Sequence, residues 1–137
     1  MNPLTQEELE ILKSHTIYGE QFLSKKPFFQ MARDIALYHH ENWDGTGYPD
    51  GIKDGDIPLA ARIVRIADIF DNLTYPTDTC RPELINTYEP CVSKTDALNI
   101  ILRYSGIHFD PAITSIFKQI VESDLIGNIT RRNTVEN

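Results

Sequence analysis

The sequence is poor in cysteine, in basic residues and in long apolar runs. Its only cysteines, Cys80 and Cys91, lie in one loop-like region without the C-x-x-C spacing or basic neighbours that activate a thiol. With no signal peptide in the sequence, we expect two ordinary thiols in a reduced, cytoplasmic setting. Acidic residues outnumber basic ones by 20 to 13, for a net charge of −7. This balance argues against a general binder of nucleic acid polymers or anionic membranes.

No apolar run approaches the roughly 20 residues that cross a bilayer, so we expect no membrane insertion. The 137 residues suffice for one domain with its own core. What the sequence does contain is helical periodicity, with start signals at Thr5 (with Glu8), Pro58, Ser93 (with Asp96) and Asp110-Pro111. Helices are predicted from residue 6 through His15 to about 25, over 28–38, from 58 to 73, over 93–105 and from 110 to about 121. The fold class is therefore all-α, with about five helices.

Residues 39–51 interrupt this pattern with two adjacent histidines, His39 and His40, followed by a loop that contains three glycines. The histidines fall at the end of a helix, where neighbouring side chains point about 100° apart. They can therefore serve two positions, such as two metal ions, or one ion and a substrate oxygen. The alternative is a helix C-terminus stabilised by imidazoles. Loops as long as 41–56 usually carry function or disorder, and we favour function here.

Two further polar residues leave alternatives open. Asp68 is surrounded by apolar residues, and a carboxylate near a buried surface must be paired, protonated or bound to a metal. An ion pair with Arg62 or Arg65 and a role as metal ligand are equally compatible with its position. His15, considered alone, is more typical of a helix face or core. His108 is predicted to be a surface or capping residue.

Gly47-Tyr48-Pro49, together with the stretches 57–63 and 66–74, resembles the second half of the HD-GYP domain, a branch of the HD superfamily of metal-dependent phosphohydrolases. The resemblance implies an HD-domain-like helical bundle with a GYP loop. It also implies four metal ligands, His15, His39, His40 and Asp68. The metal would be a divalent transition ion, iron or manganese foremost and zinc as an alternative. In this family two or three ions activate a hydroxide that attacks a phosphodiester, and the implied substrate is a cyclic dinucleotide, chiefly cyclic di-GMP.

The loop residues that the resemblance places toward the substrate or a partner are Asp44, Gly45, Gly47, Tyr48 and Pro49. The segment 75–92 departs from the family pattern. Arg81 is the one remnant of a phosphate-binding segment that normally has two arginines, and Glu89 and Pro90 fall in an apparent insertion. We expect a partial HD-GYP domain over 1–127 and a polar tail over 128–137.

The sequence contains no His-Asp dipeptide, although such a pair gives the HD superfamily its name. The resemblance covers only about the second two-thirds of an HD-GYP domain and leaves four donors where a complete centre uses about seven or eight. No complete catalytic set is expected, and an apolar groove should be exposed where the earlier helices would pack. A homodimer, or a partner chain, is expected to cover this groove.

Three functions therefore stay open. The first is part of a cyclic di-GMP phosphodiesterase, weakly active or inactive as this chain and missing its N-terminal portion. The second is a degenerate module that binds a nucleotide, or a partner such as a diguanylate cyclase (GGDEF) domain, without hydrolysis. The third is a metal-free structural or oligomerising helical unit.

Overall fold

The computed structural model describes residues 4–25, 27–74 and 92–123. Their α-helices are α1 (Gln6–Lys13), α2 (His15–Ser24), α3 (Gln30–Tyr38), α4 (Leu59–Thr74), α5 (Lys94–Arg103) and α6 (Pro111–Glu122), with short 3-10 turns at Pro27–Phe29 and Asp54–Asp56. No β-strand occurs in these three segments. The all-α prediction is confirmed, and the helices lie close to their predicted ranges.

The predicted helix starts are made by side-chain caps. Thr5 and Glu8 form a reciprocal capping box at α1. The Ser93 hydroxyl accepts a hydrogen bond from the Asp96 amide at α5 (3.1 Å), and the Asp110 carboxylate accepts one from the Ala112 amide at α6 (2.8 Å). These local signals set the helix boundaries independently of the rest of the fold.

The first predicted helix differs from expectation because it divides at Ser14. α1 ends at Lys13 and α2 begins at His15. The Ser14 hydroxyl donates to the Ile11 carbonyl (2.6 Å), and the Thr16 hydroxyl donates to the Lys13 carbonyl (3.0 Å). Hydroxyls that bond back to the preceding turn compete with the helical ladder and bend helices. The division places His15 in the first turn of α2.

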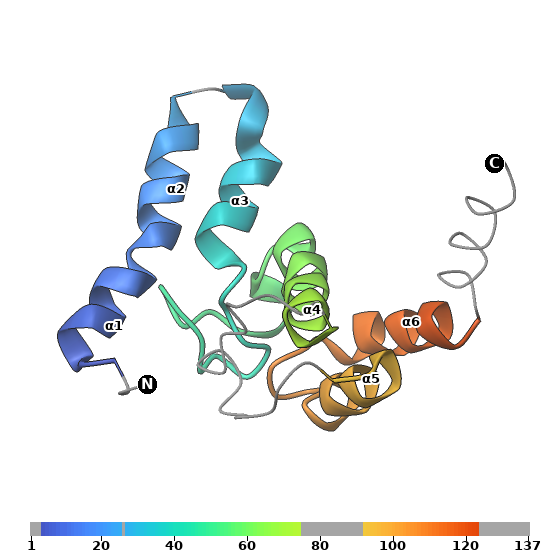
Figure 1. Ribbon diagram of the computed structural model, residues 1–137. Coiled ribbons are helices and arrows are strands. Elements are labelled where there is room, and N and C mark those ends of the chain that lie inside the picture. The colour runs from blue at the N-terminus through green and yellow to red at the C-terminus, as the bar shows by residue number, and fades with distance from the viewer. Residues whose placement is uncertain (1–3, 26, 75–91, 124–137) are drawn as a thin grey trace, which may run out of the picture.

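α4 lies between two groups of helices (Figure 1). On one side α2 and α3 form an antiparallel hairpin, in which a Cβ on Gly19 would lie only 3.3 Å from the Ala36 Cβ. On the other side α5 and α6 pack against α4. The long loop between α3 and α4 lies at the end of the α2–α3 hairpin where His15 and His39 meet, so the hairpin and α4 together position the loop.

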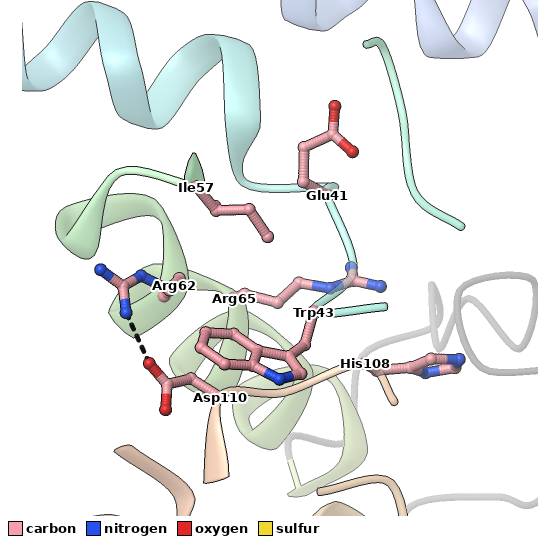
Figure 2. Close-up of a pocket in the computed structure, with 7 residues that line it drawn as sticks. All are labelled: Glu41, Trp43, Ile57, Arg62, Arg65, His108 and Asp110. Carbon is pink, nitrogen blue, oxygen red and sulfur yellow. Dashed lines mark hydrogen bonds and ion pairs between the residues drawn. The ribbon is translucent and has the colours of Figure 1, made fainter. Parts of the chain in front are cut away.

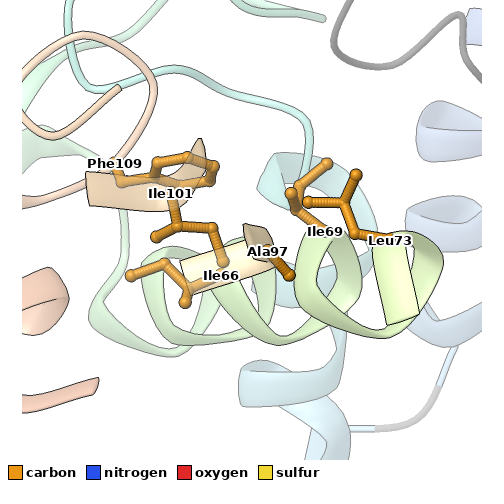
Figure 3. Close-up of a cluster of buried hydrophobic side chains, with 6 residues drawn as sticks. All are labelled: Ile66, Ile69, Leu73, Ala97, Ile101 and Phe109. Carbon is orange, nitrogen blue, oxygen red and sulfur yellow. The ribbon is translucent and has the colours of Figure 1, made fainter. Parts of the chain in front are cut away.

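The apolar core joins α4 to α5 and to the turn before α6 (Figure 3). It consists of Ile66, Ile69, Leu73, Ala97, Ile101 and Phe109. Asp110, next to Phe109, is also buried and forms an ion pair with Arg62 of α4 (2.6 Å). The core therefore fixes α4 in place beneath the loop.

Large apolar side chains are exposed on α1, α2, the Pro27–Phe29 turn and α3, the region where an exposed apolar groove is expected. The most exposed are Ile11, Tyr18, Phe22, Phe28 and Met31. Phe28 has 95% of its surface exposed. None of the helices described in the three segments is long and apolar enough to span a membrane.

Replacing Ile101 by alanine is expected to lower the free energy of unfolding by about 2 to 4 kcal/mol, because Ile101 is completely buried and its removal leaves a cavity. Ile63→Ala is the matched control, since Ile63 is 49% exposed; it should change stability by less than about 0.5 kcal/mol. Urea unfolding of both variants measures the difference. Equal effects would contradict the placement of the core.

Candidate metal centre

Three histidines meet where the α2–α3 hairpin joins the loop. His15 begins α2, and His39 and His40 directly follow α3. One ring nitrogen of each lies within 4.8 Å of the corresponding atoms of the other two. His15 is exposed, His39 is half-buried and His40 is buried. The structure thus brings together three of the four residues expected as metal ligands.

The backbone orients His15 and His39 so that their lone pairs face each other. The His15 Nδ1 atom lies 2.6 Å from the Leu12 carbonyl oxygen, and the His39 Nδ1 atom lies 2.8 Å from the Ile35 carbonyl oxygen. A carbonyl only accepts hydrogen bonds, so each Nδ1 carries the proton and each neutral ring has its lone pair on Nε2. The two Nε2 atoms are 3.3 Å apart.

This arrangement fits a bound cation. Two adjacent ligand nitrogens, each about 2.1 Å from one ion, are separated by roughly 3.0 to 3.4 Å. An Nδ1 proton donated to a backbone carbonyl is also the usual way in which proteins orient a metal-binding histidine. Without a cation, two facing lone pairs repel unless one ring takes up a proton.

His40 is held differently. An Arg65 Nη1 atom lies 3.3 Å from His40 Nδ1, and a guanidinium only donates hydrogen bonds. His40 Nδ1 is therefore the acceptor, and the neutral ring carries its proton on Nε2. Ligation through Nε2 would require this proton to move and the Arg65 hydrogen bond to open. The His15–His39 pair is thus the part of the cluster already arranged for a cation.

Burial keeps His39 and His40 neutral. Desolvation lowers the pKa of His39, and desolvation together with the nearby His39 and Arg65 lowers the pKa of His40 to about 3. A histidine binds a metal as the neutral ring, and both rings are in this form near neutral pH.

Asp68 lies on α4 beside this cluster but is not one of the three clustered residues. Its charge acts to raise the pKa of His39, although burial outweighs this effect. Its carboxylate accepts a hydrogen bond from the side-chain Nδ2 of Asn72 (3.1 Å). Among the described residues no ion pair joins Asp68 to Arg62 or Arg65, and Arg62 pairs with Asp110 instead. The ion-pair alternative is therefore not seen, and the role of Asp68 as a ligand stays a prediction.

Gly47 lets the loop pack directly on the backbone of residues 40–42, next to the three histidines. A Cβ at this position would lie 2.6 Å from the His40 carbonyl oxygen and 2.5 Å from the Glu41 Cα, and it would also overlap the Asn42 amide. These are backbone atoms that cannot move aside. The neighbouring Tyr48 ring stacks on His40 with centroids 4.8 Å apart, and the Tyr48–Pro49 peptide bond is cis.

Polar side chains hold the rest of the loop. A single oxygen of the buried Glu41 accepts hydrogen bonds from the amides of Asp50 (2.8 Å) and Gly51 (2.9 Å). The exposed Asp44 carboxylate accepts bonds from the Thr46 amide (3.0 Å) and hydroxyl (2.6 Å). Gly45 has a φ of +83°, in the region that favours glycine. Asp44 and Gly45 therefore shape the loop.

The loop also docks on the turn before α6. The Trp43 amide donates to the His108 carbonyl (3.2 Å), and the Asp44 amide donates to the Ile107 carbonyl (2.9 Å). Figure 2 shows the pocket beneath this contact, which is lined by Glu41, Trp43, Ile57, Arg62, Arg65, His108 and Asp110. His108 stacks on Tyr104 here, and the lining residues include none of the three clustered histidines, so this pocket lies outside the histidine cluster.

Comparison with known proteins identifies the family of this chain. Residues 1–113 match the family model described as HD domain. The chain belongs to the HD domain family. It is 37% identical over 126 residues to a cyclic di-GMP phosphodiesterase of Vibrio cholerae, an alignment that covers 87% of this chain and 24% of that protein. It is 35% identical over 135 residues to a cyclic di-GMP phosphodiesterase of Thermotoga maritima, covering 97% and 34%.

A solved structure is also similar. The cyclic GMP-AMP specific phosphodiesterase V-cGAP3 of V. cholerae matches with a TM-score of 0.63 and 26% identity, over 82% of this chain and 24% of that one. These matches confirm the HD-GYP assignment. The chain spans about a quarter to a third of the length of these relatives.

Some predictions for this HD domain concern residues that the structure does not describe. These residues are Cys80, Arg81, Cys91, most of the segment 75–92 that departs from the family pattern, and the tail 128–137. Conversely, sequence reasoning missed Arg65 as the residue that holds His40. The sequence does carry a signal for Arg65, which like Asp68 is a charged residue between apolar helix positions. From the sequence alone, Arg65 enters only as an ion-pair partner of Asp68.

Gly47→Ala is expected to lower the free energy of unfolding of this HD domain by at least about 2 kcal/mol, because the new methyl group overlaps backbone atoms. Gly55→Ala is the matched control in the same loop, since nothing lies within 4 Å of a Cβ there. Thermal unfolding of both variants measures the effect. A Gly47→Ala variant as stable as Gly55→Ala would contradict the described closure of the loop.

Proposed function

We propose that this chain contributes the metal-binding part of an HD-GYP domain that hydrolyses cyclic di-GMP. The observation that carries the proposal is the His15–His39 pair, whose Nε2 lone pairs face each other at 3.3 Å while both Nδ1 atoms lie against backbone carbonyls. The names of the relatives support the substrate class, because both curated proteins described above are called cyclic di-GMP phosphodiesterases.

His15 and His39 would hold a divalent transition ion, with Asp68 and His40 as the further ligands. Imidazole and carboxylate donors suit iron, manganese or zinc, with iron or manganese preferred by the family resemblance. Such an ion would supply Lewis-acid stabilisation of the charge that develops on a phosphodiester during hydrolysis. The chain's own contribution is to hold neutral imidazoles in place and to close the loop of Asp44, Gly45, Gly47, Tyr48 and Pro49 beside them.

The four proposed donors are fewer than the roughly seven or eight of a complete centre with two ions. We therefore propose that the chain alone hydrolyses cyclic di-GMP weakly or not at all. The apolar face of Ile11, Tyr18, Phe22, Phe28 and Met31 is proposed to be covered by a second copy of the chain. In the non-catalytic alternative, the loop would bind a cyclic dinucleotide or a GGDEF-domain partner without hydrolysis.

His39→Ala and Asp68→Ala are each expected to weaken metal binding at least about tenfold, while helicity stays nearly unchanged. The measurement is metal content per chain by elemental analysis after anaerobic incubation with iron(II) or manganese(II), with circular dichroism for helicity. His108→Ala is the control, because this histidine lies outside the cluster. Equal metal content in His39→Ala and the parent would remove the proposed site.

The same samples separate the two functions. Slow release of a linear dinucleotide from cyclic di-GMP, dependent on the metal and lost in His39→Ala, is the expected result for the phosphodiesterase. Tight binding of intact cyclic di-GMP by a metal-loaded chain that releases no product would favour the non-catalytic module instead.

A further inference from the structure

Lys13 lies at the margin of the histidine cluster. It is the last residue of α1, two positions before His15, where the α1–α2 junction lies beside the loop (Figure 1). Its ammonium nitrogen is 5.6 Å from the centroid of the Tyr48 ring, which in turn stacks on His40 with centroids 4.8 Å apart. A cation over a tyrosine face at this distance is attracted by the ring. Tyr48 is therefore in contact with both the ammonium and His40.

Two arginines that contact this loop, Arg62 and Arg65, are already engaged. Arg62 pairs with the buried Asp110 (2.6 Å), and Arg65, which is only 5% exposed, donates to His40 and to the Asn42 side-chain oxygen (3.0 Å). Besides its contact with the Tyr48 ring, Lys13 forms an ion pair with Glu10 of its own helix (3.1 Å), in which 32% of the Lys13 and 59% of the Glu10 side chain is exposed. An exposed pair of this kind contributes little free energy and opens readily. Lys13 can thus turn to another anion.

A cyclic dinucleotide bound at this cluster brings negative phosphates to a chain whose net charge is −7. Asp68 adds a further negative charge beside the histidines, so an anionic ligand needs positive charge nearby. An ammonium group is a compact point charge suited to a phosphate oxygen.

We propose that Lys13 binds a non-bridging phosphate oxygen of the substrate, exchanging its contact with Glu10 for one with the phosphate. This role rests on the proposed function, because it requires a phosphodiester at the His15–His39 pair. It assigns to α1 a part in substrate binding in addition to that of the loop.

The test is calorimetric titration of cyclic di-GMP into the manganese-loaded chain at low salt. Lys13→Met is expected to weaken binding about fivefold to tenfold, to reduce the dependence of binding on salt, and to leave metal content unchanged. Lys13→Arg should retain most of the affinity. Glu10→Gln should tighten binding, because it removes the carboxylate that competes for the ammonium.

Lys118→Met is the matched control, since Lys118 also pairs with a glutamate of its own helix, Glu122 (3.8 Å), but lies on α6. It should bind cyclic di-GMP as the parent does. Lys13→Met with parental affinity, or with reduced metal content, would overturn the proposal. A parent chain that binds metal but no cyclic di-GMP would overturn the proposed function, and the role of Lys13 with it.

Discussion

Two imidazole nitrogens that carry lone pairs are held 3.3 Å apart, and the rest of the site is arranged around this contact. The contact depends on backbone carbonyls one turn earlier in each case, Leu12 for His15 and Ile35 for His39. The division of the first helix at Ser14 matters for this reason, because it places His15 at the start of α2, opposite the end of α3. Helix geometry therefore preorganises the pair before any ion binds.

The loop after α3 closes over the pair and is fastened from three directions. Gly47 packs on the backbone of residues 40–42. A Glu41 oxygen accepts hydrogen bonds from two loop amides, and the Trp43 amide donates one to the turn before α6. Arg65 connects this arrangement to α4 by donating to both His40 and Asn42. Arg65 is buried on α4, so these two bonds link the position of His40 to the apolar core beneath.

Local signals predicted the helices, whereas the grouping of His15 with His39 and His40 was implied by the resemblance to the HD-GYP domain. Capping residues define helix starts, and glycines mark the loop. The break at Ser14 was not predicted, since it arises from hydroxyl-to-carbonyl bonds that do not alter the apolar pattern. The role of Arg65 was missed for a different reason: its partners lie more than twenty positions away, and periodicity carries no information on such pairings.

The most direct test is a nitrogen-15 NMR measurement of the histidine side chains, made near pH 7.5 before and after one equivalent of zinc, which is diamagnetic. Backbone control of the pair predicts that His15 and His39 both carry their proton on Nδ1, and that zinc shifts the Nε2 resonances of both while Nδ1 stays protonated. A proton on Nε2 in both neutral rings, or zinc bound through Nδ1, would contradict a preorganised pair.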